Sequence, residues 1–347
     1  MALISYETVC STAIGALTRA GVPLAHARLQ GDLLIEAELA DRPSHGLLRL
    51  PRIIERIENG VINPETDGAR TWRRSFLDVD GRMGLGPVVA DSALAEMSEH
   101  ARVNGIAIAA IRNNNHLGML GWYARRIASR GQVLIALTTS EALVHPWSGR
   151  TAMLGTNPIA IGVPTAGAPF VVDMATSLVS MGQIHDYAIQ GRPIPEGWAL
   201  DERGNPTTDA GAAKAGSIAP FGGAKGYALG LAFEVLVTFL ADCAVGRDVV
   251  GTLDSDQPCN KGDVMIVVDP GERPQIARRI TDYLDAVRAS GDAAHPVSVP
   301  GDRAGEARRQ RLVEGIELPD RLWQQLEEMA AGGNNGTEKV RKAARRH

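Results

Sequence analysis

The segment IAIAAIRNNNHLGMLGWYARRIASRGQVLIALTT, residues 106–139, decides the fold class. It begins and ends with short apolar runs, 106–112 and 133–139, whose length and composition are typical of buried strands. Between them lie an asparagine-rich loop and a stretch with helical spacing that stops near Gly131. The order strand, loop, helix, strand is typical of a βαβ unit and predicts an α/β protein.

The sequence on both sides extends this pattern. Helical spacing begins after Ser5, a possible N-cap, and continues in three segments to Gly60. Further strands are expected over 75–81, 159–165, 169–175 and 262–270. Further helices are expected over 86–104, 174–191, 225–245, 272–290 and 319–332. The segment 194–209 is rich in turn residues and separates two of these helices.

Composition indicates a globular protein of about two domains. The chain has 347 residues, of which 44% are hydrophobic and 22% are charged. Its net charge of -4 argues against a nucleic-acid interface on the body of the protein. Basic residues crowd only the last nine positions, and we expect a frayed, solvated tail there.

Cysteine usage and the apolar segments indicate a cytoplasmic protein with no membrane span. Three cysteines, Cys10, Cys243 and Cys259, are too few and too far apart for a disulfide framework or a zinc motif. The N-terminus carries Glu7 and no basic region, so it does not read as a signal peptide. The longest apolar segment, 227–245, is interrupted by acidic residues and predicts a buried helix.

Several familiar site motifs are missing from the sequence. The stretch GLGPVV at 84–89 has Val89 where a dinucleotide-binding fingerprint needs its third glycine. In GGAKG, at 222–226, Lys225 precedes the glycine, so the stretch is not a P-loop. Neither an HExxH pair nor a GxSxG elbow occurs. We therefore expect no metal site, no Rossmann site and no hydrolase nucleophile.

Two segments are candidates for substrate chemistry. In RPSHGLLR, His45 and Arg49 are four residues apart, and on a helix they would share one face with Ser44 nearby. Arginine binds carboxylates through paired, charge-assisted hydrogen bonds. The alternative is a serine N-cap beside a surface arginine. His116 follows a strand end, where α/β proteins bind ligands, and suits acid–base work near neutral pH.

Other readings of the histidines stay open. A lone histidine is often structural, and His116 could be a satisfied core residue. His145, in the polar turn LVHPWSG after the next strand, is a second candidate for the proton-transfer role.

Three further stretches are candidates for an anionic cofactor. GTNP at 155–158 forms a turn, while DMATS at 173–177 and FGGAKG at 221–226 place small residues at expected helix starts. Exposed N–H groups at helix starts bind anions, and Lys225 adds a positive charge. The alternative is that the small residues allow close packing of helices.

Together these motifs resemble one family. SHGLLR, NHLGMLGWYA, LGTNPIAIGVP, DMATS, GWALDERGNPTTD and GGAKGYALG follow the order and spacing of the malate/L-lactate dehydrogenase family, over about residues 5–330. That family is unrelated to the Rossmann dehydrogenases and includes ureidoglycolate, sulfolactate and diketogulonate dehydrogenases and cyclic imino acid reductases. The resemblance implies a homodimeric oxidoreductase using NAD or NADP, with a mixed sheet in its cofactor domain.

The resemblance also implies roles for individual residues. The acid–base histidine falls on His116, and the substrate-side residues fall on Ser44, His45 and Arg49. The cofactor contacts fall on Ser140, Thr156, Asn157, Asp173, Met174, Ala175, Lys225 and Gly226, with Gly301 and Asp302 as a later pair.

We divide the chain accordingly. Residues 76–271 form the cofactor domain, 1–75 and 272–335 form a mostly helical domain, and 336–347 form the basic tail. Three positions depart from the family pattern: Ile53 replaces a common aromatic residue, Gln183 a common lysine, and Ala224 a common histidine.

The predicted reaction is hydride transfer between the cofactor and C2 of a small 2-hydroxy acid or 2-oxo acid. Two alternatives remain: reduction of a cyclic imino acid, or a binding protein that kept the fold without chemistry.

Overall fold

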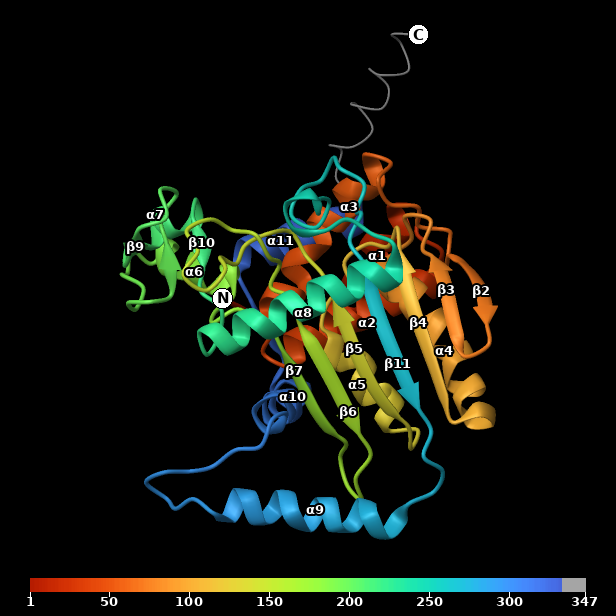
Figure 1. The fold of residues 1–347 in the computed structure, drawn as a ribbon. Helices are drawn as coiled ribbons and strands as arrows, with labels where there is room; N and C mark the ends of the chain where they lie inside the picture. Colours follow the sequence, from red (N-terminus) through yellow and green to blue (C-terminus); the bar gives the residue numbers. More distant parts are fainter. Residues whose placement is uncertain (333–347) are drawn as a thin grey trace.

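A seven-stranded mixed sheet forms the centre of the molecule (Figure 1). The computed structural model describes residues 1–332, so the basic tail expected at 336–347 lies outside the described residues. The strand order is β2-β3-β4-β11-β5-β6-β7. These strands are β2 (Ala69–Arg73), β3 (Phe76–Asp80), β4 (Ile106–Arg112), β11 (Asp263–Val268), β5 (Val133–Thr138), β6 (Ile159–Val163) and β7 (Phe170–Met174).

The predicted strand–helix–strand unit is confirmed, but its strands are not neighbours. Helix α5 (Leu120–Ala128) connects β4 to β5, and β11 lies between them, antiparallel to both. The strands β4 and β5 therefore run in the same direction without hydrogen-bonding to each other. Among the paired strands of this sheet only β3 and β4 are parallel, which confirms the mixed sheet that the family resemblance implied.

Helices cover both faces of the sheet. On one face, α4 (Gly86–Asn104) and α5 pack against the strands, and α2 (Leu24–Leu39) packs on these two helices. On the other face, α8 (Ala224–Ala241) packs against β4, β5 and β11. Small residues such as Ala107, Ala109 and Ala136 are fully buried in this core, which lets the layers approach closely in a chain with few aromatic residues.

The prediction that the apolar segment around α8 forms a buried helix is wrong in part. Glu234 and Val237 are buried against the sheet, whereas Leu229, Leu236 and Phe239 are exposed. By length and composition α8 could cross a membrane, but that test is also passed by core helices of soluble proteins. One face of α8 packs on three strands of the sheet. The opposite face is also apolar, and the described residues do not cover it.

The first and last segments of the described chain pack together. Strand β1 (Ala2–Ile4) pairs with β12 (Ile316–Leu318), and α1 (Tyr6–Arg19) packs on α11 (Asp320–Ala331). The expected Ser5 cap is confirmed, because its side chain accepts a hydrogen bond from the Thr8 amide. Helix α10 (Asp302–Glu314), which the sequence analysis did not anticipate, packs on α2. The domain boundaries stay a prediction.

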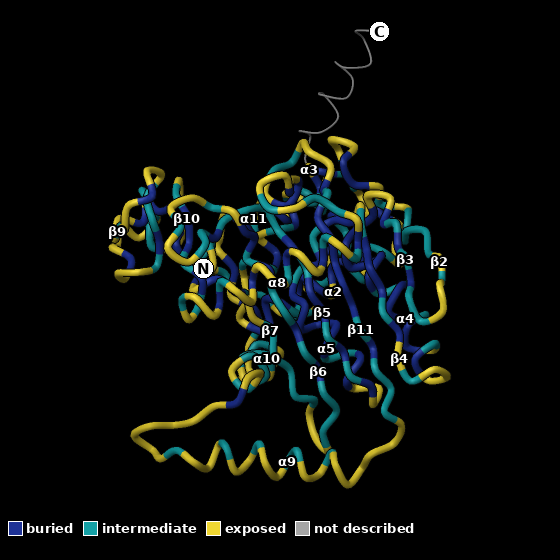
Figure 2. The backbone as a smooth tube through the Cα atoms, in the orientation of Figure 1, coloured by how far each residue is buried: buried dark blue, intermediate teal, exposed yellow. Residues whose placement is uncertain are grey.

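Two parts stand away from the central sheet. Helices α6 (Met181–Ile189) and α7 (Ala210–Lys214) and the short strands β8 (Ala199–Leu200), β9 (Pro206–Thr207) and β10 (Ser217–Ile218) form a small lobe with its own apolar cluster. Helix α9 (Pro274–Ala289) has no buried residue and crosses beyond the ends of the sheet strands (Figure 2). Its Thr281 Oγ1 accepts a hydrogen bond from Ala166 on the β6–β7 connection.

Two predicted helices are interrupted. Residues 43–49 form two short 3-10 turns separated at Gly46, and α3 begins only at Leu50 and ends at Glu58. Residues 174–180 are not helical, because Met174 ends β7 and α6 begins after its N-cap Ser180. Small residues are common both in turns and at the starts of helices. The sequence pattern therefore does not distinguish these two structures in the two stretches.

Candidate active site

The three asparagines before His116 fasten the loop that carries it. Asn113 has a positive φ of 51°, and its side-chain amide donates to Asp80 Oδ1 over 3.1 Å. The Asn115 side-chain amide donates to the carbonyls of Met83 and Gly84, each over 2.8 Å. These bonds connect the loop after β4 to the turn after β3. They explain why polar residues follow a buried strand.

The middle asparagine contacts a buried ion pair. Asn114 is fully buried, and its amide donates to Asp263 Oδ2 over 3.2 Å. The other oxygen of Asp263 accepts from Lys261 Nζ, and both charged side chains are almost completely buried. A buried carboxylate is costly unless its lone pairs are used, and here two donors use them. The loop is therefore attached to the first residues of β11.

His116 lies at the centre of the site. Its ring is half-buried and stacks on His45, with ring centroids 5.7 Å apart and planes 25° apart. The Gly118 amide donates to His116 Nδ1 over 3.1 Å, which leaves Nε2 as the nitrogen that can exchange a proton with a ligand. The ring remains partly accessible and lines a cavity, which favours a site residue over the alternative of a satisfied core histidine.

Both histidines are held neutral by their surroundings. Burial lowers the pKa of His116 well below its usual value, and the charges of Arg49, His45 and Lys261 lower it further. Burial lowers the pKa of His45 to about 4, with smaller effects from Arg49 and Arg42. A neutral imidazole can accept a proton, so both rings are in the basic state at neutral pH.

The predicted substrate segment converges on these rings, although not as one helix. The 3-10 turn Pro43–His45 and the turn Leu47–Arg49 place Ser44 Oγ 3.1 Å from His45 Nδ1. Arg49 Nε donates to the Ser44 carbonyl over 2.8 Å. The expected shared helical face is therefore replaced by a compact double turn that still brings the three side chains together. Burial, and then the charge of Arg52, lowers the pKa of Arg49 to about 10.

Two cavities are lined by residues of the histidine loop. A narrow cavity is lined by Arg49, Arg52, Ile53, Asn115 and His116. A second cavity of about 320 Å³ is lined by Met119, Gly121, Asp173, Met174 and Gly301. Residues 113–121 thus contribute to both, and the second cavity lies within the range of about 300–1,000 Å³ typical of ligand sites.

Several predicted cofactor residues surround the larger cavity. Asp173 Oδ2 accepts a hydrogen bond from the Gly121 amide over 2.7 Å, and burial raises the pKa of that carboxyl. Met174 is exposed in the cavity wall, and Ala175 follows it. Gly301 lines the cavity with a φ of 97°, a conformation that favours glycine. These contacts fit a cofactor in this cavity, although its binding residues stay a prediction.

The carboxylate of Asp302 is paired with an arginine of the same chain and is not free to bind a ligand. Its oxygens pair with Arg288 over 2.7 and 2.9 Å, and one of them also accepts the Val299 amide. The side chain therefore steadies the start of α10 next to the larger cavity and does not line it.

A second group of predicted residues forms a polar junction beyond the end of β7. The Ser140 hydroxyl lies 3.3 Å from Thr156 Oγ1 and accepts the Thr156 amide. The Thr156 carbonyl accepts from the backbone and the hydroxyl of Thr176. Asn157 is fully buried with a φ of 32°. The structure thus brings the ends of β5 and β7 and the turn between them to one place.

The sequence analysis missed the residue that holds this junction to α8. Glu234 is buried, and its carboxylate accepts from Asn157 Nδ2 over 2.6 Å and from the Gly246 amide over 2.9 Å. It also accepts the Gly155 amide at 3.3 Å. The sequence signal for this role was a single carboxylate within an apolar helix. An unpaired buried charge is too costly to keep, so such a carboxylate indicates nearby hydrogen-bond donors.

The start of α8 matches the predicted helix start, whereas DMATS does not. Lys225 is exposed in the first turn of α8, and Gly226 is buried directly behind it. A Cβ on Gly226 would lie 1.7 Å from the Phe221 carbonyl, so the turn needs glycine there. DMATS instead covers the end of β7 and the loop after it, so the prediction of a helix start at 173–177 is wrong.

His145 lies outside the two cavities. Its backbone amide donates to the Ile218 carbonyl, and its Nδ1 lies 2.9 Å from the Pro146 carbonyl. Neither cavity wall includes it. This location favours His116 for the proton-transfer role.

A partly accessible histidine in a cation-lined cavity, on a mixed sheet without a Rossmann fingerprint, fits the class of non-Rossmann NAD(P)-dependent oxidoreductases that the motifs resemble. The family model described as malate/L-lactate dehydrogenase matches residues 4–327. The chain belongs to the malate/L-lactate dehydrogenase family.

Similar proteins support this placement. The crystal structure of a dehydrogenase from Sinorhizobium meliloti superposes with a TM-score of 0.90 at 49% identity, covering 95% of this chain and 98% of that one. The malate/(S)-sulfolactate dehydrogenase of Methanothermus fervidus is 36% identical over 334 residues, or 94% of this chain and 97% of that protein. A Δ1-pyrroline-2-carboxylate reductase of Pseudomonas fluorescens is 33% identical over 332 residues, or 93% and 97%.

Replacing Glu234 with glutamine should weaken cofactor binding and lower stability. The amide loses one acceptor oxygen, so one of the donors from Asn157, Gly155 and Gly246 stays unpaired, at a cost of about 1–3 kcal/mol. Thermal unfolding and the KM for the cofactor measure the two effects. Glu327→Gln, on an exposed position of α11, is the matched control. Unchanged values for Glu234→Gln would contradict its role at the junction.

Proposed function

We propose that this enzyme transfers a hydride between NAD or NADP and C2 of a small 2-hydroxy acid or its 2-oxo form. The observation that carries the proposal is that one loop, 113–121, lines both cavities and holds His116 in the wall of the narrow one. The nicotinamide, when bound, accepts or supplies the hydride. Asp173, Met174 and Gly301 would hold the cofactor on one side of the loop, with Ser140, Thr156, Ala175, Lys225 and Gly226 along the adjoining surface.

Arg49 is assigned to the carboxylate of the substrate. One guanidinium nitrogen is used by the Ser44 carbonyl, and in the described residues no carboxylate pairs with the rest of the group. Charge-assisted hydrogen bonds from a fixed guanidinium orient a carboxylate and place C2 near His116. Ser44 and His45 keep the arginine and the His116 ring in position through their mutual contact and stacking.

His116 is assigned to the proton. In the oxidation direction its Nε2 accepts the hydroxyl proton, and in reduction the charged ring returns it to the oxygen at C2. Nε2 can accept that proton only when the neutral ring carries its own proton on Nδ1, so the hydrogen bond from the Gly118 amide to Nδ1 must be given up before the transfer. Because burial and nearby cations also disfavour the charged ring, it releases the proton readily.

Relatives carry two reaction types, a hydroxy acid dehydrogenase and a cyclic imine reductase. A positively charged pocket favours an anionic hydroxy or oxo acid over a cyclic imino acid whose protonated nitrogen offsets the charge of its carboxylate, so we place the hydroxy acid first. A panel of 2-oxo acids and cyclic imines, assayed with NADH and NADPH, tests this choice. Turnover of the imines alone would overturn it.

Replacing His116 with glutamine should lower kcat by about 10²–10⁴-fold, because the general base is lost. Cofactor affinity, measured by nicotinamide fluorescence, should not change, because the ring faces the substrate cavity. His145→Gln is the matched control and should retain full kcat, since that residue lines neither cavity. A normal kcat in His116→Gln, or a collapse in His145→Gln, would move the proton-transfer role elsewhere.

The oxidation reaction should keep its kcat/KM as the pH falls through 6.5. The base must be neutral, and a pKa lowered well below the usual histidine value leaves it neutral there. Activity should be lost only at a lower pH, where the ring becomes protonated. A pH profile of kcat/KM with the hydroxy acid measures this, and a midpoint near 6.5 would show that the ring titrates as an ordinary histidine.

We also propose a cytoplasmic homodimer, as the family resemblance implied. The uncovered apolar face of α8, with Leu229, Val235, Leu236 and Phe239, supports a subunit contact. The three cysteines are free thiols, which supports a reducing compartment.

Phe239→Glu should convert the dimer to a monomer, measured by light scattering after size-exclusion chromatography. Phe239 is 84% exposed, so the new charge does not disturb the subunit's own core but would be buried in a contact through α8. Val103→Glu is the control, because Val103 is 85% exposed on α4, across the sheet from α8. A dimer that survives Phe239→Glu would place the contact elsewhere.

A further inference from the structure

The narrow cavity beside His116 is smaller than the substrate that we assign to it. Its volume is about 30 Å³. This is about the volume that one water molecule occupies in the liquid, whereas ligand sites typically measure about 300–1,000 Å³. A 2-hydroxy acid can therefore reach Arg49 and His116 only if part of the cavity wall moves.

One part of this wall has no regular secondary structure. Gly251 and Thr252 line the cavity and belong to the segment 250–257, which forms neither a helix nor a strand. Much of the remaining wall belongs to helices α2, α3 and α4 and to the histidine loop, which its asparagines fasten to neighbouring turns. A segment held by a few side-chain contacts separates at lower cost than a packed helix. The segment 250–257 is therefore the part of the wall that is best suited to move.

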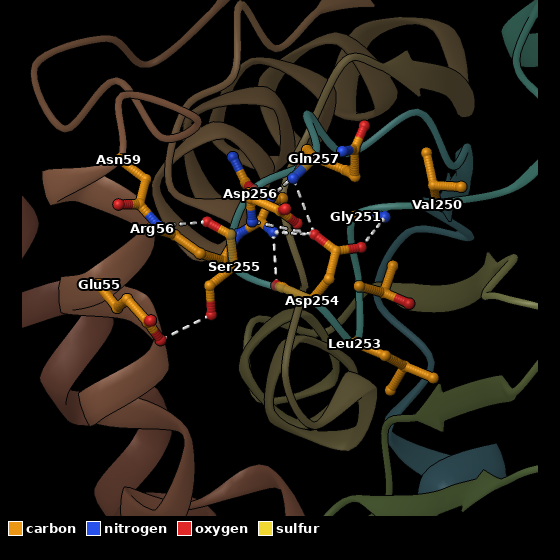
Figure 3. A network of polar contacts seen from close by, with 12 residues as sticks. Glu55, Arg56, Asn59, Val250, Gly251, Leu253, Asp254, Ser255, Asp256 and Gln257 are labelled. Atoms are coloured by element: carbon orange, nitrogen blue, oxygen red, sulfur yellow. Dashed lines mark hydrogen bonds and ion pairs between the residues drawn. The ribbon is translucent and has the colours of Figure 1, made fainter.

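Arg56 on α3 holds one end of the segment (Figure 3). Its Nη1 donates to the Asp254 carbonyl over 2.8 Å, and its Nη2 donates to the Gln257 carbonyl over 3.0 Å. The same Nη2 donates to Asn115 Oδ1 over 3.1 Å. Because Arg56 is buried, one guanidinium joins the segment both to α3 and to the residue before His116.

The segment also has contacts that keep its own shape. The Asp254 carboxylate accepts the backbone amides of Gly251, Asp256 and Gln257, at 3.1, 3.2 and 2.9 Å. These bonds lie within the segment, so they need not break when it separates from α3. On its outer side, the Ser255 hydroxyl donates to Glu55 Oε2 over 2.7 Å.

Glu141 holds the other end of the segment. This residue follows Ser140, and its Oε1 accepts the amide and the hydroxyl of Thr252, over 2.7 and 3.0 Å. The Leu253 amide donates to the same oxygen over 2.8 Å. Hydrogen bonds to a carboxylate are stronger than neutral ones. Glu141 is half-buried, so water can take the place of these donors when the segment leaves.

We infer that the segment 250–257 is a lid over the narrow cavity, and that Arg56 and Glu141 are the positioning residues that hold it closed. This inference rests on the proposed function, which places the substrate between Arg49 and His116. The lid opens to admit the substrate, and on closing it returns Gly251 and Thr252 to the cavity wall. Because Arg56 also bonds Asn115, the closed lid and the histidine loop are held by the same side chain.

A reversible cross-link tests whether the lid must open. Glu55→Cys combined with Ser255→Cys replaces the hydrogen-bonded pair on the outer side of the lid, and a short bis-methanethiosulfonate reagent connects the two thiols. Cross-linking should abolish turnover of 2-oxo acids in proportion to the cross-linked fraction, and dithiothreitol should restore it. Cofactor binding, measured by nicotinamide fluorescence, should not change, because the described wall of the larger cavity includes no residue of the lid.

The single variants Glu55→Cys and Ser255→Cys, treated with the same reagent, are the matched controls. They report any reaction at the three native cysteines and should keep their turnover. Full turnover in the cross-linked double variant overturns the lid while the proposed hydroxy acid function stands. A wild-type enzyme that turns over no 2-oxo acid refutes the proposed function, and the inference falls with it.

Removing Glu141 should weaken substrate binding without weakening cofactor binding. In Glu141→Ala the lid is closed for a smaller fraction of the time, so the KM for the 2-oxo acid should rise by about 10- to 100-fold, as expected when a charged hydrogen bond is lost. Glu141→Gln keeps an acceptor oxygen and should restore most of the affinity. Glu196→Ala, at an exposed position of the small lobe, is the control. An unchanged KM for the 2-oxo acid in Glu141→Ala, or an equal rise in the KM for the cofactor, contradicts the role of Glu141 in holding the lid.

Discussion

The buried pair of Lys261 and Asp263 is the contact on which the site depends. In the sheet register, Asp263 lies opposite Ile111 near the end of β4 and opposite Thr138 at the end of β5. Because β11 runs against both strands, its first residues meet the edge where they finish, and the Asp263 carboxylate can hold Asn114 there. An unpaired charge in this position would cost several kcal/mol, so the ion pair with Lys261 is needed to hold the carboxylate in place.

Burial then sets the chemistry of the loop that this contact holds. His116 and His45 are neutral because they are surrounded by protein and lie near Arg49, so the cation to which we assign the substrate carboxylate also keeps the proposed base neutral. A bound anion would reduce that effect. In the proposed reaction, substrate binding and proton transfer are thus coupled through electrostatics at short range.

Two other buried charged side chains are paired within the protein. Glu234 and Arg56 each bear a charge that is used up on backbone amides or carbonyls of a neighbouring loop, at 155–157 and 250–257 respectively. The loop 250–257 also lines the narrow cavity, through Gly251 and Thr252. In the narrow cavity, Arg56 is therefore paired within the protein, whereas Arg49 and Arg52 form no ion pair among the described residues.

Much of the fold could be read from local patterns. The spacing of apolar residues in 106–139 predicts the strands and the helix, and Ser5 predicts its cap, because these depend on neighbours within a few residues. The ordered motifs predict the family, which the comparisons confirm. His116 and its loop follow from the same motifs, although the roles of the site residues stay predictions.

What the sequence determined by itself was therefore the order of elements, the family and the candidate residues. Tertiary structure decided the rest: that β11 separates β4 from β5, that Gly46 breaks the helix around His45, that α8 is apolar on an uncovered face, and that Glu234, Asp263 and Arg56 hold the site. The reason is physical. Strand order, burial and charge pairing join residues that are far apart in the chain, such as Arg56 and Asp254, 198 positions apart, and no local pattern records which distant group will neutralise a charge.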